Sequence, residues 1–349
     1  MQSTADKKAR LTETALDPDL PICDAHHHLR DRPNDRYFLE EFVQDTASGH
    51  NIVATVCVEN RTMYRTDGPE CMKPIGETEF LASVAAQAAT TPKLSTAVAA
   101  GIVGHADLSL GEAVSEVLEA HLQASSTHFR GIRHSTTWDE SDTIRSDAPR
   151  GLLANRAFRE GFACLERYRL SFDAWLYHPQ LPELVALARA FPGVTIVLDH
   201  MGGPLGVGPY KGKRDGVFQV WSKAIAELST CPNVVIKLGG FGSTRSGYDW
   251  HEREIQPDSA ELANVMAPYF DFCIENFSVR RCMFESNFPV DKASYSYVSI
   301  WNAFKRISRN FSAAERSALF HETATRIYRL AADSLAPSNS TLRVCAPIE

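Results

Sequence analysis

Three consecutive histidines, His26 to His28, follow a short apolar stretch near the start of the chain. In an extended strand, successive side chains point to opposite faces, so His26 and His28 share one face and His27 takes the other. Two imidazoles on one face can bind a single divalent cation. A third histidine, His200, ends another apolar run, VTIVLDH, directly before a glycine turn. Three imidazoles around one ion leave a coordination position open for water, as a hydrolytic centre requires.

Each of these histidines could also have a purely structural role, because a single histidine is more often a hydrogen-bonded core or loop side chain than a metal ligand. A run of three can also be the remnant of a purification tag. This run lies inside a strand pattern, which argues against a tag. A His-x-His pair together with a further strand-end histidine therefore favours a functional site.

The histidines need strands that bring them to one place, and the sequence predicts eight. Short apolar runs alternate with longer segments whose apolar residues recur every three or four positions, which is a βα rhythm. The predicted strands are residues 21–26, 52–59, 94–103, 129–135, 170–177, 194–200, 233–240 and 281–286. Several are apolar on both faces, as a parallel sheet covered by helices requires. Eight such units favour a single-domain α/β fold, the closed (β/α)8 TIM barrel, over an open doubly wound sheet.

The composition narrows the class of protein. Of the 349 residues 44% are hydrophobic, which is enough for a large core, and the formal charge of -7 offers no basic field for nucleic acid. No apolar run reaches membrane-spanning length. The eight cysteines are scattered without a CxxC pair, as is typical of reduced thiols. We therefore expect a cytoplasmic protein that acts on a small molecule, binds neither nucleic acid nor membranes, and pairs as a homodimer.

The predicted domain organisation has three parts. A polar N-terminal extension occupies residues 1–20, one barrel occupies residues 21–332, and a peripheral tail occupies residues 333–349. In a barrel, polar residues at the carboxyl ends of the strands face the mouth where ligands bind. The strand ends are therefore the places to look for further site residues.

Four strand segments together resemble a known family. DAHHHL in the first strand, FRGIRH in the fourth, VLDHMGG in the sixth and MFESNFPVD in the eighth are similar to the amidohydrolase-related, lactonase-like (β/α)8 hydrolases. This group includes sugar lactonases and 2-pyrone-4,6-dicarboxylate lactonase. The resemblance implies hydrolysis of a ring ester at the barrel mouth, with His26, His28 and His200 around the reacting carbonyl. It also implies that these three histidines hold one divalent ion, zinc above all, although some members work without metal.

The eighth strand departs from the family pattern. Many relatives have an aspartate there as ligand or general base, whereas this chain has Asn287, and an amide cannot take a proton from water at neutral pH. Glu285, on the same side by alternation, and Asp291, in the following loop with a freer approach, are the carboxylates that could replace it. The alternative for Glu285 is a buried ion pair with Lys237 or Arg133.

Other strand ends indicate what is bound. Arg133 matches an arginine that relatives use on a substrate carboxylate, and Lys237 lies where the dicarboxylate branch has a basic residue. A guanidinium grips a carboxylate with two hydrogen bonds, whereas an ammonium acts as a point charge, so we expect an anionic substrate. Further candidates for holding polar groups or packing on a ring are Glu59, Asn60, Trp175, Tyr177 and His178. Packing against a helix is an equal alternative for Trp175 and Tyr177.

The preferred hypothesis is a hydrolase that opens a lactone, or a related ester-like bond, in a small carboxylated or polyhydroxylated metabolite. The three histidines polarise the carbonyl or hold a metal, and Glu285 or Asp291 assists proton transfer. A bound metal would lower the pKa of water and make Asn287 tolerable. The first alternative is decarboxylation or hydration of an unsaturated acid in the same site. The second is an inactive barrel that binds a small ligand.

Overall fold

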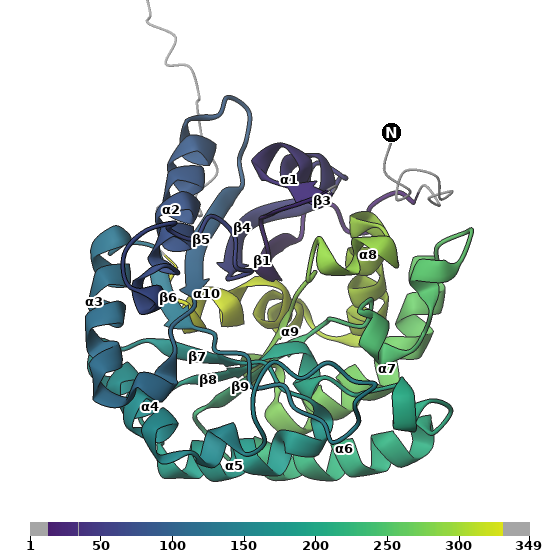
Figure 1. The fold of residues 1–349 in the computed structure, drawn as a ribbon. Helices are drawn as coiled ribbons and strands as arrows, with labels where there is room; N and C mark the ends of the chain where they lie inside the picture. Colours follow the sequence, from purple (N-terminus) through teal and green to yellow (C-terminus); the bar gives the residue numbers. More distant parts are fainter. Residues whose placement is uncertain (1–12, 34, 331–349) are drawn as a thin grey trace, which may run out of the picture.

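The computed structural model describes residues 13–33 and 35–330, and Figure 1 shows its fold. The predicted tail at residues 333–349 and most of the predicted N-terminal extension lie outside the described residues. The predicted boundaries of these two segments therefore stay predictions.

Eight parallel strands form one sheet in which each strand pairs with its neighbour along the chain. They are β1 (Pro21–His27), β4 (Asn51–Val58), β5 (Ala97–Gly104), β6 (Phe129–Ile132), β7 (Ser171–Ala174), β8 (Ile196–Leu198), β9 (Val234–Leu238) and β10 (Cys282–Phe284). His27 pairs in parallel with Phe288 just beyond β10, and the N–H of His28 donates to the Phe288 carbonyl at 2.7 Å, which brings the two edges together. The predicted single-domain (β/α)8 barrel is confirmed, and every predicted strand overlaps an observed one.

Helices surround the sheet, as the ring of coiled ribbons in Figure 1 shows. They are α1 (Leu39–Thr46), α2 (Ile75–Thr90), α3 (Val114–Ala124), α4 (Arg156–Tyr168), α5 (Leu181–Ala190), α6 (Arg214–Ser229), α7 (Ser259–Phe277), α8 (Tyr297–Ile307), α9 (Ala313–Ser317) and α10 (Thr323–Ile327). Their apolar faces pack on the outside of the strands in one large core. Among the described residues, none of these helices combines the length and the apolar composition that crossing a bilayer would need.

A second, smaller apolar cluster fills the barrel interior. It contains small strand residues such as Ala25, Ala54 and Val197, and Tyr328 packs with them just after α10. The Tyr328 hydroxyl donates to the carboxylate of Asp173 at 2.6 Å. The apolar filling therefore ends at a buried polar layer, and this layer supports the site.

A short antiparallel hairpin follows β1. Its strands are β2 (Arg30–Arg32) and β3 (Asp35–Tyr37), which pair only with each other. Because the hairpin leaves the carboxyl end of β1, it lies at the mouth of the barrel.

Candidate active site

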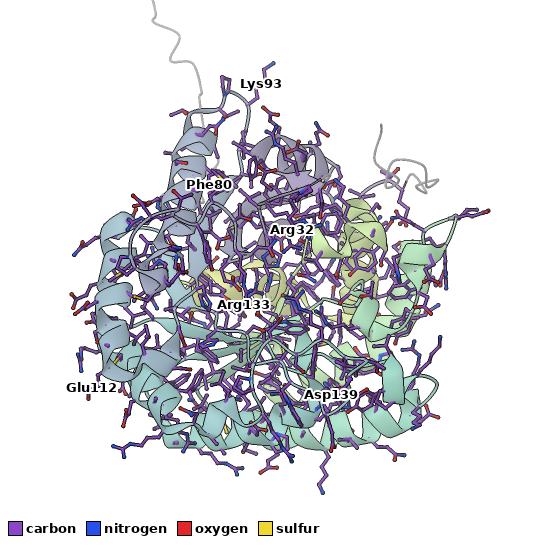
Figure 2. The ribbon with its side chains drawn as sticks, in the orientation of Figure 1. Arg32, Phe80, Lys93, Glu112, Arg133 and Asp139 are labelled. Atoms are coloured by element: carbon purple, nitrogen blue, oxygen red, sulfur yellow. The ribbon has the colours of Figure 1, made fainter. Side chains whose placement is uncertain are left out.

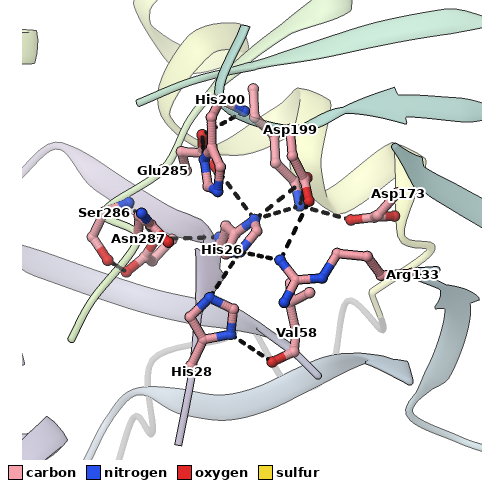
Figure 3. Close-up of polar contacts among 12 residues, drawn as sticks. His26, His28, Val58, Arg133, Asp173, Asp199, His200, Glu285, Ser286 and Asn287 are labelled. Atoms are coloured by element: carbon pink, nitrogen blue, oxygen red, sulfur yellow. Dashed lines mark hydrogen bonds and ion pairs between the residues drawn. The ribbon is translucent and has the colours of Figure 1, made fainter. Parts of the chain in front are cut away.

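The structure brings the three predicted histidines together (Figure 3). Nε2 of His26 lies 3.1 Å from Nε2 of His28, and the ring centroids of His26 and His200 are 4.7 Å apart. His27 points the other way, where it stacks on Phe42 with a centroid distance of 4.1 Å. The alternation predicted for the HHH run is therefore what the strand shows.

The turn after β8 determines how His200 reaches this cluster. The strand ends at Leu198, two residues earlier than predicted, and His200 has a left-handed backbone with φ of 53°. This turn directs both Asp199 and His200 toward the barrel axis, where strand alternation would have separated them. Gly240 packs against the His200 ring so closely that a Cβ would lie 2.5 Å from its Cγ, so only glycine fits there.

Glu285 forms a pair with His200. Its Oε1 accepts from Nδ1 of His200 at 2.6 Å and from the backbone N–H of His200 at 3.1 Å, while Oε2 lies 3.1 Å from Nδ1 of His26. Burial opposes ionisation, but the charges of His200 and His26 lower the pKa of Glu285 to about 2. Burial would lower the pKa of His200, yet Glu285 outweighs it and raises that pKa. The predicted alternative, a buried carboxylate paired with a cation, is confirmed in its burial, but the partner is His200 and not Lys237 or Arg133.

Lys237 lies beneath His26 and does not line the cavity above it. Nζ is 2.7 Å from Oδ2 of Asp173, 3.0 Å from Oδ1 of Asp199 and 3.1 Å from Nδ1 of His26, and its side chain is completely buried. The structure therefore contradicts the predicted contact of Lys237 with substrate. Asp173 and Asp199 were not predicted as part of the site, although a carboxylate inside an apolar strand run indicates a buried ionic partner.

Arg133 lies on the cavity floor and is held by Glu59. Its Nε is 2.8 Å from Oε1 of Glu59, and its Nη1 donates to Nε2 of His26 at 3.2 Å and lies 3.5 Å from Oδ2 of Asp199. Glu59 thus orients the guanidinium, and its neighbour Asn60 lines the same cavity. Arg133 is the predicted substrate-binding cation that the structure does place beside the histidines.

Asn287 faces the cavity, and Asp291 is hidden behind it. Nδ2 of Asn287 donates to Oδ1 of Asp291 at 2.9 Å, and Oδ2 of Asp291 accepts from the Tyr295 hydroxyl at 2.6 Å and from the N–H of Gly242 at 3.0 Å. Burial raises the pKa of Asp291 to about 7. The freer approach predicted for Asp291 is wrong, because the side chain is fully buried.

The segment after β7 contributes differently from the prediction. Trp175 lines the cavity with its ring edge-on to His200 at 4.9 Å. Tyr177 lines a small side pocket beside His200, and its hydroxyl donates to the Arg145 carbonyl at 2.7 Å. His178 does not contact the three histidines. Its Nδ1 accepts from the N–H of Leu205, and its ring contacts Tyr210. The predicted place of His178 in the site is wrong.

A cavity of about 370 Å³ lies at the barrel mouth. His28, Glu59, Arg133, His200 and Asn287 all line it. This size is typical of sites for small molecules. The two carboxylates that were candidates for the base, Glu285 and Asp291, are not among its lining residues.

The nitrogen atoms of the site fit a divalent cation. Nδ1 of His28 donates to the Val58 carbonyl at 2.8 Å, so the lone pair of His28 lies on Nε2, which faces His26. Glu285 likewise holds the proton of His200 on Nδ1. A second possible ligand set takes Glu285 in place of the predicted ligand His28, because ligand atoms of His26, His200 and Glu285 all lie within 4.8 Å of one another.

The charge of the buried layer fits such an ion as well. The acidic groups are Glu59, Asp173, Asp199 and Glu285, and the permanent cations are Arg133 and Lys237. When all four acids are ionised, two negative charges lack a cationic partner in this layer. A divalent ion, or protonation within the layer, balances them.

The chain is similar to several known proteins. The amidohydrolase family profile matches residues 23–330. Uncharacterized protein y4mH of Sinorhizobium fredii is 34% identical over 89% of this chain and 99% of its own length. An L-fucono-1,5-lactonase of Burkholderia multivorans is 30% identical over 66% of this chain and 72% of its own length. The crystal structure of a Burkholderia multivorans amidohydrolase with bound zinc is 26% identical with a TM-score of 0.68, covering 89% of this chain and 99% of that one.

Proposed function

Because the chain belongs to the amidohydrolase family, whose profile spans residues 23–330, we propose that this hydrolase opens a lactone or a related ester-like bond in a small polar metabolite. The observation that carries the proposal is the convergence of His28, His200 and Arg133 on one cavity at the barrel mouth, with the completely buried His26 in contact with each of them (Figure 3). The similarity to an L-fucono-1,5-lactonase supports a lactone as the substrate class.

Proton transfer from the attacking water requires a base, and Asn287 cannot supply one. The pair of His200 and Glu285 takes this role. Glu285 accepts the Nδ1 proton of His200, so the lone pair lies on Nε2, and the ring lines the cavity. Nε2 accepts the proton of water, and the carboxylate stabilises the imidazolium that forms.

Negative charge that develops on the carbonyl oxygen is stabilised by Arg133. Its guanidinium lines the cavity and is oriented by the ion pair with Glu59, so little reorganisation is needed during the reaction. Asn287 donates its amide hydrogen to Asp291, which leaves its Oδ1 to accept a hydrogen bond from water or from a substrate hydroxyl.

A divalent ion, zinc being the expected one, would be held by His26, His28 and His200, the latter through Nε2. When bound, it lowers the pKa of water and polarises the carbonyl. The chain's own groups already supply a proton acceptor and a cation, so the pair of His200 and Glu285 carries the proton when no ion is present.

The proposal is tested by assaying the purified protein for acid release from a panel of sugar lactones and aromatic lactones. Each lactone is offered to untreated protein, to chelator-treated protein and to protein supplied with zinc or manganese. We expect ring opening, and we expect His200→Asn to lower kcat at least about 100-fold, as for loss of a general base. His321→Gln is the matched control, because His321 does not line the cavity.

Two outcomes would contradict the proposal. If no lactone in the panel is opened by protein supplied with either metal, lactone hydrolysis is wrong. If an unsaturated acid instead loses carbon dioxide or gains water without ring opening, the barrel performs the alternative chemistry.

A further inference from the structure

Arginines gather at the outer part of the cavity. The β2–β3 hairpin supplies Arg30 and Arg32, the segment after β4 supplies Arg61, and the segment after β6 supplies Arg145. All four line the same cavity as His28 and His200. In Figure 2, Arg32 and the floor residue Arg133 are both labelled over the middle of the ring of helices.

This outer group of four arginines has more positive charge than its acidic partners balance. Arg30 pairs with Asp35 at 2.6 Å, and Arg145 pairs with Asp147 at 2.8 Å. Within residues 13–33 and 35–330, neither Arg32 nor Arg61 forms an ion pair. Arg245 and Asp107 line the cavity too, so five guanidinium groups face three carboxylates, and two positive charges remain.

The arginines also repel one another, and some of their N–H groups have no hydrogen-bond acceptor among the described residues. Burial lowers the pKa of Arg32, and the charges of Arg30, Arg145 and Arg61 lower it further against the opposing effect of Asp35. Arg32 uses one nitrogen, Nη2, on the side-chain oxygen of Asn60 at 2.8 Å. Nε of Arg30 is buried and has no hydrogen-bond partner among the described residues. These like charges repel one another, and a bound anion would offset that repulsion.

We propose that Arg30, Arg32, Arg61 and Arg145 form a subsite for a phosphate group carried by the substrate, distant in the cavity from the carbonyl that reacts. A phosphate monoester has nearly two negative charges and three terminal oxygens that point in different directions, which suits guanidinium groups arriving from three segments. A carboxylate has one charge and two coplanar oxygens, which one guanidinium satisfies. The subsite rests on the proposed function and makes the substrate a phosphorylated hydroxy-lactone or an ester of similar size.

Binding of inorganic phosphate to the full-length protein, measured by isothermal titration calorimetry, tests the subsite. We expect saturable binding that weakens about tenfold in Arg32→Ser and in Arg61→Ser, because each loses a charge-assisted hydrogen bond. Arg36→Ser is the matched control on the same hairpin, because Arg36 does not line the cavity. This variant and His200→Asn are both expected to bind phosphate as the wild type does.

Several results would overturn the subsite. The first is no saturable binding at millimolar phosphate, and the second is an equal loss of phosphate affinity in Arg36→Ser. The third is a loss of phosphate affinity in His200→Asn with none in Arg32→Ser, which would place phosphate at the histidines. Malonate binding as tightly as phosphate would show a dicarboxylate site instead. Because the titration needs no turnover, phosphate binding can be observed even if no lactone is hydrolysed. Lactone hydrolysis can likewise be observed even if phosphate does not bind.

Discussion

Replacing Glu285 with glutamine tests whether its carboxylate makes His200 a base. The variant keeps the size of the side chain and an oxygen that can accept from Nδ1, but it removes the negative charge 2.6 Å from that nitrogen. Hydrogen bonds to charged groups contribute roughly 1.5–3 kcal/mol. Because this bond strengthens as His200 gains a proton, and about 1.4 kcal/mol corresponds to a factor of ten in rate, we expect kcat/KM to fall roughly 10- to 150-fold.

The pH dependence gives a second readout. In the wild type, Glu285 outweighs burial and raises the pKa of His200. Without that charge, the pKa of His200 is expected to fall. Since Nε2 must be unprotonated to accept a proton, the acid limb of the kcat/KM profile is expected to move to lower pH in Glu285→Gln. Steady-state assays across the pH range on chelator-treated protein measure both effects.

Glu77→Gln is the control for removing a buried carboxyl group. Glu77 accepts from the backbone N–H groups of Asn60 and Thr62, and it contacts none of the three histidines. The kcat/KM of the Glu77→Gln variant is expected to stay within about threefold of the wild-type value. An acid limb that does not move in Glu285→Gln, or an equal loss of rate in Glu77→Gln, would refute the role assigned to the pair of His200 and Glu285.

Three further predictions concern stability and are measured by urea unfolding. Asn287→Asp places a second carboxylate at the 2.9 Å contact with Asp291, so we expect the unfolding free energy to fall by roughly 1–3 kcal/mol. The double variant Asn287→Asp/Asp291→Asn restores one amide and one carboxylate and is expected to recover this loss. If it does not, the two side chains do not interact as described. Lys237→Met leaves the carboxylates of Asp173 and Asp199 buried without their cation, which is expected to cost about 3–5 kcal/mol, in part restored by adding Asp173→Asn. A loss below about 1 kcal/mol would contradict the buried ion pair. Burial and the neighbouring Glu59 raise the pKa of Glu77 to about 8, against 4.5 ordinarily. The folded wild type therefore binds this proton more tightly than the unfolded chain, and its stability declines as the pH rises from about 4.5 to about 8, by roughly 1.4 kcal/mol per pH unit. The unfolding free energy of Glu77→Gln should not show this decline. If the unfolding free energies of the two proteins change with pH in parallel, Glu77 does not cause the decline.

The sequence alone determined the eight strands and the positions of the imidazoles along them. Alternation in a strand is a local property, so the separation of His26 and His28 from His27 follows from three adjacent residues. The barrel follows from repeated βα units, and the barrel places strand ends at one mouth, which brings His200 and Arg133 to the same cavity.

Only the tertiary structure decided which buried charges pair. Glu285 is a partner of His200, 85 residues earlier, and Lys237 is a partner of Asp173, 64 residues earlier. Strand parity indicates the face of a side chain but not which of several nearby charges it contacts, since that depends on loop backbones such as the left-handed turn at His200. The arginines of the outer subsite come from such loops, and no periodicity in the sequence brings them together.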